Sequence, residues 1–557
     1  MTAFPYFSKK EKERESTLYF LKREEEEKLA RKRAKVFGLP YINLIVTPIS
    51  IDALSLVDEE KARQGKFVPF YLLEKNLKIA CLNPQNPVLK ETLSLLKKKG
   101  YKTQLFLCSK TSLLRGWKEY EKVPKDVGKV IGKIVIKKEE VEEIESLDEF
   151  REKIEIFKNK GVNYFLKMIL IGGLSFDASD IHIVPRSDDV RVRFRLDGIM
   201  HTIFFFERHL FPPLLARIKV LAHLKVNVTD IAQDGRFTIL YEGKEIEVRV
   251  SVVPGEYGED VVMRILNPKM ILTIDQLGLH PWLKEILLYE MSKPTGMILT
   301  TGPTGSGKTT TLYACLRYIA RPQIKVFTIE DPIEYHLEGI AQTQVEPEKG
   351  YDFANALRAA LRQDPDVILV GEIRDQDTAN TAVQAALTGH LVFSTLHTND
   401  ASGTIPRLIE MGVTPSNIAP ALNLAIAQRL LRRLCEHCKV EDHPPSAMIE
   451  KIKEKINSLP EKVKSQLSFD INNLKFFRAK GCKFCHNTGY KGRIGIFEMF
   501  QIKGEIEKII PNAPSVEEVR EAALKEGMIP FQIDGLLRVL EGITSLEELQ
   551  RVTGPLE

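Results

Sequence analysis

The 557-residue sequence predicts an α/β protein with several domains. At roughly 150 residues per domain, this length indicates three to four of them. After about residue 285, apolar β-rich runs (GMILTTG, IKVFTIE, VILVGE, LVFSTLH) alternate with helical segments, which is typical of a parallel sheet covered on both faces. Earlier, "DVRVRFRLDGIM" alternates strictly between apolar and charged residues, as a half-buried strand of an antiparallel sheet does.

Composition and charge narrow the class of protein. Apolar residues make up 43% of the chain, and 80 basic against 75 acidic residues give a net charge of +5. This near-balance argues against a dedicated nucleic-acid binder, which would concentrate basic residues on one face. The sequence contains neither an apolar run of about 18 residues nor an apolar core of a signal peptide at its N-terminus, so we expect a cytoplasmic protein.

The N-terminal third divides into three expected segments. Residues 1–36 are dense in charge and predict a helical arm with acid-to-base i,i+4 pairs, either solvated or docking on a partner. Residues 37–122 predict a small α/β domain, because "LKIACLNP" alternates like a strand and "VLKETLSLLKKKG" has helical spacing and a terminal glycine. Residues 123–155 are charged and poor in aromatic residues, which indicates a linker.

Two further domains follow the expected linker. Residues 156–285 predict an α+β domain, in which Val190, Val192, Phe194 and Leu196 share one face of a strand that ends in an Asp-Gly turn. "EIEVRVSVVPG" predicts a second strand of the same kind. Residues 286–557 form the expected parallel α/β domain.

A phosphate-binding loop stands at the start of that last domain. Gly302-x-x-x-x-Gly307-Lys308-Thr309 follows a strand-like run and opens a predicted helix, which is the context this motif requires. Its glycines let backbone N–H groups converge on phosphate oxygens, Lys308 reaches the terminal phosphates, and Thr309 binds Mg²⁺. We therefore expect ATP to be held by Gly302, Pro303, Thr304, Gly305, Ser306, Gly307, Lys308, Thr309 and Thr310.

Carboxylates at the ends of two predicted strands complete a hydrolytic site. Glu372 follows the apolar run Val367–Val370, where ligands bind in open α/β sheets, and it is a candidate for the Mg²⁺ water shell or merely a helix cap. In "TIEDPIEY", Asp331 or Glu334 is a candidate to orient or deprotonate the attacking water. A plain acidic turn is the alternative interpretation of this second cluster.

Two histidines flank the predicted strand in "TGHLVFSTLHTND". His390 and His397 are candidates for a sensor of the γ-phosphate, because a histidine reports charge through a hydrogen bond even when it is neutral. The alternative is that each is a structural residue at a strand end.

Four of the seven cysteines form two C-x-x-C pairs, Cys435 with Cys438 and Cys482 with Cys485. Each pair has the spacing that binds one side of a tetrahedral zinc, and four sulfur ligands indicate a structural ion. Four unrelated thiols or a redox pair are the alternatives. The insertion between the pairs has few apolar residues and no core of its own, so we expect zinc to hold residues 435–485 folded.

These motifs together resemble the ATPases of type II secretion and type IV pilus assembly. The resemblance covers about residues 160–557 and rests on "ASDIHI", "RFRLDG", "IAQDGRF", "TGPTGSGKTTTLY", "TIEDPIEY", "LRQDPDVILVGEIRD", "TGHLVFSTLHTNDA" and "AQRLLRRLC". Residues 37–120 resemble the N-terminal domain of the assembly-type members. The resemblance implies a RecA-like core preceded by a PAS-like α+β domain.

The resemblance further implies a hexameric ring in which the middle domain supplies arginines to the nucleotide site. The candidates are Arg195, Arg217 and Arg236, with Arg264 and Arg374 as weaker ones and Arg358 and Arg362 for the site or a subunit interface. Retraction ATPases of this family lack the four cysteines and the long N-terminal part, so the chain resembles an extension motor. Some members bind cyclic diguanylate, but the repeated Leu-Gly pattern associated with it is not evident here, and we expect no such binding.

The expected function is therefore ATP hydrolysis that drives type IV pilus assembly through an inner-membrane platform protein, and thereby acts on pilins indirectly. The motor would work at the cytoplasmic face of that membrane and reach it through partners only. A type II secretion pseudopilus ATPase is the alternative. A nucleic-acid translocase, from another class, would need a basic channel and stacking aromatic residues, and the sequence has only two tryptophans.

Overall fold

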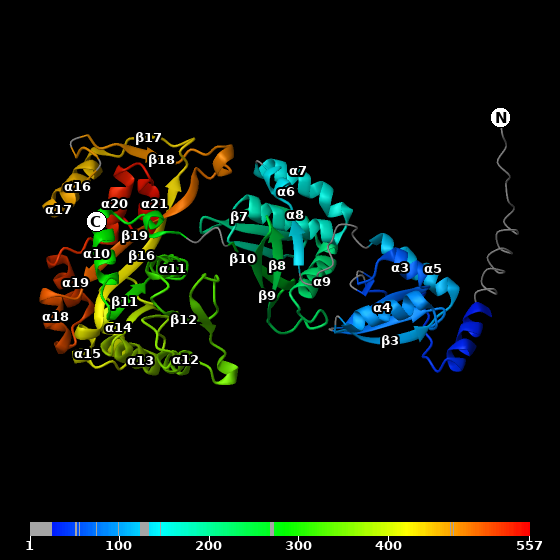
Figure 1. Cartoon of the computed structure of the whole chain (residues 1–557). Helices are drawn as coiled ribbons and strands as arrows, with labels where there is room; N and C mark the ends of the chain where they lie inside the picture. Colours follow the sequence, from blue (N-terminus) through cyan, green and yellow to red (C-terminus); the bar gives the residue numbers. More distant parts are fainter. Residues whose placement is uncertain are drawn as a thin grey trace, which may run out of the picture. The chain divides into compact units, whose positions relative to one another are not determined.

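The computed structural model describes residues 25–50, 53–54, 56–73, 75–98, 100–122, 133–144, 146–267, 272–467, 469–471 and 473–556. The chain divides into two compact units, Met1–Val135 and Ile136–Glu557. In Figure 1 the colours run along the sequence from blue to red. Within the described ranges, no helix combines the length and the apolarity that crossing a membrane requires.

The first unit is built on a three-stranded sheet in the order β1-β2-β3, with β1 antiparallel and β3 parallel to β2. Its elements are β1 (Phe67–Leu73), β2 (Asn76–Cys81), β3 (Lys102–Leu107), α3 (Glu59–Gln64), α4 (Pro87–Lys98), α5 (Lys110–Lys118) and the 3-10 helix η1 (Glu119–Lys122). Leu89, Leu96 and Leu113 of the helices are buried in one core with the strands. The predicted strand and helix of this region are confirmed as β2 and α4.

The described part of the expected N-terminal arm packs on this domain. Residues 25–36 are helical, and Ala30 and Ala34 are buried against Leu107. The Glu27 carboxylate accepts a hydrogen bond of 2.7 Å from the Ser109 hydroxyl. Residues 25–36 are therefore helical and mostly exposed, as expected, but the face that carries Ala30 and Ala34 packs on this domain, because two small residues allow close packing. The rest of the arm, residues 1–24, lies outside the described residues.

A seven-stranded sheet opens the second unit, in the order β4-β8-β9-β10-β5-β6-β7. Its strands are β4 (Lys133–Ile136), β5 (Asp180–Pro185), β6 (Asp189–Leu196), β7 (Ile199–Glu207), β8 (Gln233–Tyr241), β9 (Lys244–Gly255) and β10 (Gly258–Leu266). From β8 to β7 every neighbouring pair is antiparallel. In β6 every second residue is buried, as predicted for Val190, Val192, Phe194 and Leu196.

Helices lie along the chain between the strands of this sheet. The first two of them begin within residues 123–155, where a linker was expected. The helices are α6 (Lys138–Glu142), α7 (Leu147–Phe157), η2 (Lys158–Lys160), α8 (Val162–Ser175), η3 (Arg208–Leu210) and α9 (Phe211–Leu221). Phe150 and Ile154 of α7 are buried, and a Cβ on Gly172 of α8 would lie 2.4 Å from the Phe150 ring. The linker expectation for 123–155 is therefore wrong from Lys133 onward, because two apolar residues at i,i+4 suffice to dock a charged helix.

A second seven-stranded sheet carries the phosphate loop, in the order β13-β12-β14-β15-β11-β16-β19. Its strands are β11 (Gly296–Thr301), β12 (Val326–Glu330), β13 (Ala341–Gln344), β14 (Val367–Val370), β15 (Leu391–Leu396), β16 (Leu422–Leu434) and β19 (Tyr490–Gln501). The first six are parallel and β19 is antiparallel to β16. Every residue of β11, β14 and β15 is buried, which confirms the parallel sheet predicted from continuous apolar runs.

Helices cover this sheet and complete its core (Figure 1). They are η5 (Ile274–Leu277), α10 (Pro281–Met291), α11 (Lys308–Ile319), η6 (Pro347–Lys349), α12 (Phe353–Leu361), α13 (Gln376–Leu387), α14 (Thr404–Glu410), α15 (Pro415–Ala421), α18 (Gly504–Ile509), η8 (Ile510–Asn512), α19 (Val516–Lys525), α20 (Phe531–Leu540) and α21 (Leu546–Thr553).

The insertion between the cysteine pairs is anchored in the same core. It consists of β17 (Val440–Asp442), α16 (Ser446–Asn457), α17 (Glu461–Lys464), β18 (Phe476–Arg478) and η7 (Lys483–Cys485). Ile452, Ile456 and Val463 are buried in the core that the parallel sheet forms. The insertion therefore has no core of its own, as expected, and its buried residues join the core of the parallel sheet instead.

Candidate active site

The phosphate loop joins β11 to α11 by a turn that depends on its glycines. Gly302, Gly305 and Gly307 have φ values of 136°, 80° and 91°, which L side chains rarely adopt. A Cβ on Gly302 would lie 2.6 Å from the backbone oxygen of Gln428, and one on Gly307 would lie 2.7 Å from Gln428 Nε2. The loop therefore needs glycine both for its conformation and for its close approach to β16.

Lys308 begins α11 with its side chain folded over the loop. Its Nζ donates hydrogen bonds to the backbone oxygens of Gly302 at 2.6 Å and Pro303 at 3.2 Å. Burial lowers the pKa of Lys308, and the charge of Glu372 acts in the opposite direction. The ammonium group thus stands where the helix N-terminus already favours an anion.

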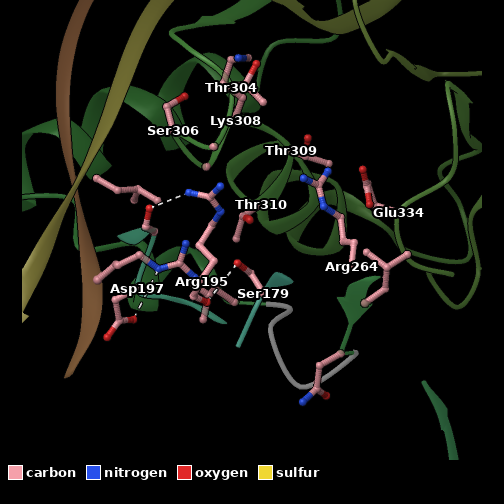
Figure 2. A pocket seen from close by; sticks show the side chains of 18 of the residues that line it. Ser179, Arg195, Asp197, Arg264, Thr304, Ser306, Lys308, Thr309, Thr310 and Glu334 are labelled. Atoms are coloured by element: carbon pink, nitrogen blue, oxygen red, sulfur yellow. Dashed lines mark hydrogen bonds and ion pairs between the residues drawn. The ribbon is translucent and has the colours of Figure 1, made fainter. Parts of the chain in front are cut away.

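A cleft of about 1130 Å³ lies over this loop. Thr304, Gly305, Ser306, Gly307, Lys308, Thr309 and Thr310 line it, which brings seven of the nine predicted nucleotide-binding residues together. Thr309 is exposed toward the cleft, as a ligand for a cation must be (Figure 2). Residues from the middle domain, among them Ser179, Arg195 and Arg264, line the same cleft.

Gln428 is a contributor that sequence reasoning missed. Its Oε1 accepts a hydrogen bond of 2.6 Å from the Thr311 hydroxyl, which braces the first turn of α11 from the neighbouring strand β16. Gln428 stands in the motif "AQRLLRRLC", but the motif alone does not show that its side chain contacts the phosphate loop.

The acidic cluster after β12 separates into two roles. Glu330 is buried and accepts hydrogen bonds from the hydroxyls of Tyr313 and Thr328 and, at 3.1 Å, from Gln342 Nε2. Asp331 and Glu334 line the cleft. Glu330 also borders the cleft, but its carboxylate is engaged by these hydrogen bonds and holds the strand end in shape, which leaves Asp331 and Glu334 as the candidates to meet a bound nucleotide.

Glu372 and His397 come from the ends of adjacent parallel strands. The Thr395 hydroxyl donates to the backbone oxygen of Gly371 at 2.8 Å, which ties the end of β14 to that of β15. His397 Nε2 then lies 3.4 Å from Glu372 Oε2, and Arg374 Nη2 lies 2.6 Å from Glu372 Oε1. Both Glu372 and His397 line the cleft.

His390 is at the wrong end of its strand for the predicted sensor. It precedes β15, and its Nδ1 is 3.1 Å from the backbone oxygen of Ala385. At about 3.3 Å per residue, six strand residues place it about 20 Å from the edge that carries the phosphate loop. The prediction of a sensor role for His390 is therefore wrong, because residues that flank a strand lie at opposite edges of the sheet.

Two arginines of the middle domain share one buried carboxylate beside the cleft. Asp180 accepts from Arg195 Nε at 3.1 Å and from Arg264 Nε at 2.8 Å. Burial raises the pKa of Asp180, but the hydrogen bonds from Arg264 and Ser179 and the two positive charges outweigh burial and hold the pKa below its ordinary value. Figure 2 shows Arg264 on the side of the cleft that also carries Thr309 and Glu334.

Arg249 of β9 is a further arginine that the sequence did not single out. Its Nη2 donates to the Ile333 backbone oxygen at 2.6 Å, and its Nη1 lies 3.4 Å from Glu334 Oε2. It stood in the predicted strand "EIEVRVSVVPG", where alternation gave no reason to separate it from a surface charge. The contact joins the middle domain to a candidate catalytic carboxylate.

The other predicted arginines lie away from the cleft within this chain. Arg236 is exposed on β8 and is 3.3 Å from Glu247, and Arg217 lies on α9. Arg358 donates to Asn355 at 3.2 Å, and Arg362 to the backbone oxygen of Arg358 at 3.0 Å. None of the four is among the described residues that line the cleft.

The four cysteines meet in one cluster whose geometry suits a metal ion. All four Sγ atoms lie within 4.8 Å of one another, with Cys435 to Cys482 at 3.8 Å and Cys438 to Cys485 at 3.7 Å. Tetrahedral bonds of about 2.3 Å to sulfur place the sulfur atoms about 3.8 Å apart. The donor set therefore fits a tetrahedral ion.

Comparison with known proteins agrees with this geometry. Residues 158–551 match the family model described as "Type II/IV secretion system protein", and residues 37–126 match the MshEN domain model. The chain is 37% identical to the type IV pilus assembly ATPase PilB of Myxococcus xanthus, over 95% of this chain and 92% of that one. It is 42% identical to type II secretion system protein E of Pseudomonas aeruginosa, over 70% of this chain and 74% of that one.

A solved structure with the same fold is the ATPase DotB of Yersinia pseudotuberculosis. It is 21% identical, has a TM-score of 0.51, and the match covers 71% of this chain and 94% of that one. The expectation that the N-terminal domain does not bind cyclic diguanylate stays a prediction.

The two histidines give the first test of this geometry. His397→Ala should lower the rate of ATP hydrolysis by about 10- to 100-fold, because it removes a hydrogen-bonding group beside Glu372. His390→Ala should leave the rate unchanged. Phosphate release measures both, and urea unfolding shows whether either variant is destabilised. An equal loss of rate in both variants would contradict the assignment.

Removing the metal gives the second test. A chelator should speed hydrogen exchange in residues 435–440 and 481–489, because the sulfur cluster is what closes these turns. Helix α16 should keep its protection, since its buried residues belong to the main core. Binding of a nonhydrolysable ATP analogue should persist. Unchanged exchange in both turns after complete chelation would show that the metal does not hold them.

Proposed function

Because the chain belongs to the type II/IV secretion system protein family, we propose that it is the ATPase that drives type IV pilus assembly. The observation that carries this proposal is the match to the Myxococcus pilus assembly ATPase along nearly the whole length of both chains. The matches to type II secretion proteins cover about 70% of this chain. A pseudopilus ATPase is therefore the second candidate.

The cleft supports hydrolysis of ATP by this chain. The phosphate loop from Gly302 to Thr310 binds the phosphate chain, and Lys308 neutralises charge on the terminal phosphates. Thr309 and Glu372 would hold Mg²⁺, which supplies positive charge to the transferred phosphoryl group. Glu334 accepts the proton of the attacking water or orients it, with Asp331 as the alternative, and His397 responds to the γ-phosphate through Glu372.

Arginines complete the charge balance around the transferred group. Arg195 and Arg264 line the cleft from the middle domain, where both pair with Asp180. A triphosphate that enters the cleft competes with Asp180 for these guanidinium groups. Movement of the middle domain toward the nucleotide would then be driven by charge, which is how hydrolysis could be converted into mechanical work.

A hexameric ring would extend this arrangement to neighbouring copies. Neither Arg217 nor Arg236 is among the described residues that line the cleft, and in a ring they would act at the site of an adjacent copy. Arg358 and Arg362 project from α12 and serve the same site or the contact between copies. The same proposal includes a PAS-like fold for the middle domain and a RecA-like fold for the core. It also includes the helical arm and the small domain that precede them.

We assign zinc to the four-cysteine cluster on the chemistry of its ligands. Four thiolates in a closed tetrahedron leave no position for substrate, so the ion is structural. The motor would act in the cytoplasm at the inner membrane, through a platform protein that adds pilins. Its membrane contact would then depend on partners.

The catalytic assignment is tested by Glu334→Gln. This variant should bind ATP with the affinity of the parent and hydrolyse it about 100-fold or more slowly, because an amide is a poor proton acceptor. Glu338→Gln, four residues on at an exposed position, is the matched control. If Glu334→Gln hydrolyses ATP normally, the base is Asp331 or Glu372 instead.

The choice between pilus and secretion is tested in cells. A strain that lacks this chain should lose surface pili and regain them with the parent gene but not with Lys308→Ala, because that variant cannot bind the phosphates. Electron microscopy counts the pili, and a protein assay of the medium follows secretion. Loss of secreted protein with pili intact would identify the pseudopilus ATPase.

A further inference from the structure

Residues 486–492, the turn after the second cysteine pair together with the first residues of β19, contact the middle domain at two separate places. The His486 ring meets the Phe176 ring edge-on, with 4.5 Å between centroids. The backbone N–H of Gly492 donates to Asp197 Oδ2 at 2.8 Å. Phe176 ends α8 and Asp197 lies in the turn between β6 and β7, so the contacts reach two elements of the middle domain.

The shape of this turn depends on the metal ligands. Cys485 Sγ accepts backbone hydrogen bonds from Cys482 at 3.1 Å and Gly489 at 3.2 Å. The Gly489 oxygen in turn accepts from the Cys435 backbone at 3.0 Å, which joins the turn to the first cysteine pair. His486 directly follows a ligand and has a φ of 52°, so its ring direction is set by the backbone that the sulfur cluster closes.

On the other side of the contact lie the arginines of the cleft. Asp197 is two residues beyond Arg195, and Phe176 is four residues before Asp180. Figure 2 shows Asp197 and Arg195 among the side chains that line the cleft. Cys485, His486 and Gly492 line the same cleft as Lys308. The metal-bound turn and the arginine pair thus share one boundary.

We propose that this turn holds the middle domain against the ATPase core and thereby positions Arg195 and Arg264 at the nucleotide. His486 and Asp197 are positioning residues that act through the arginines. The metal then has two roles. It closes the insertion, and it fixes the shape of the turn that contacts the middle domain. The effect on ATP turnover rests on the proposed function, whereas the contact itself does not.

The chain offers a matched control in its other cysteine-pair histidine. His437 lies within the first pair, is exposed, and stacks on Phe484 with 4.1 Å between centroids. Phe484 is itself 58% exposed, and neither residue lines the cleft. Each histidine thus directly adjoins a cysteine of the cluster, but among the contacts of the described residues His486 packs on the middle domain and His437 packs on Phe484.

The experiment compares His486→Asn with His437→Asn in the full chain. Asparagine tolerates the left-handed backbone at position 486 and removes the ring. His486→Asn should keep the metal content of the parent, while hydrogen exchange in residues 174–180 and 195–200 becomes about two- to tenfold faster, the range expected for one lost aromatic pair. Its kcat should fall, whereas His437→Asn should change neither quantity. Removing the metal from the parent should speed exchange in the same two segments.

Three results would contradict the proposed role of this turn. They are unchanged exchange in His486→Asn, equal acceleration in His437→Asn, and loss of metal from His486→Asn, which would make the histidine part of the metal site. Failure of the proposed function is recognised separately. In that case the exchange results hold but the parent chain hydrolyses no ATP.

Discussion

The site depends on the parallel register of four neighbouring strands. Thr301 of β11 lies beside Leu396 of β15, and Ile329 of β12 beside Val370 of β14. Each strand therefore ends at the same edge, and the phosphate loop, Glu334, Glu372 and His397 follow these ends. No single side chain brings them together. The hydrogen-bonded ladder does so, and it is buried on both faces.

The middle domain places charged side chains at this edge of the sheet. Asp180 is buried and carries two arginines, and Arg249 reaches Glu334 from the same sheet. A buried carboxylate without a partner would be costly, so Asp180 must hold at least one cation in every state of the protein. The charges at this edge are thus paired, within the middle domain for Asp180 and across the two domains for Arg249 and Glu334.

Sequence reasoning identified the parts that local pattern determines. The loop glycines, the apolar parallel strands, the alternating β6 and the four cysteines are each recorded in spacing along the chain. His390 was misplaced because a short motif gives the neighbours of a strand but not which edge each one occupies. Gln428 and Arg249 were missed because their roles arise from contacts 117 and 85 residues away in sequence. Charged α7 was assigned to a linker because two buried apolar residues are a weak signal.

Strand β16 extends from Leu422 to Leu434, with an irregular register between Arg432 and Leu434, and Cys435 comes directly after it. Gln428, at its middle, packs against the phosphate loop. The seven strand residues from Gln428 to Leu434 span about 23 Å and pair with β19 alone, because the pairing of β16 with β11 ends at Ala427. The phosphate loop and the sulfur cluster are consequently connected by one strand of the core. The separation between the phosphate loop and the sulfur cluster is therefore set by a strand of the core, whichever other parts of the chain move during hydrolysis.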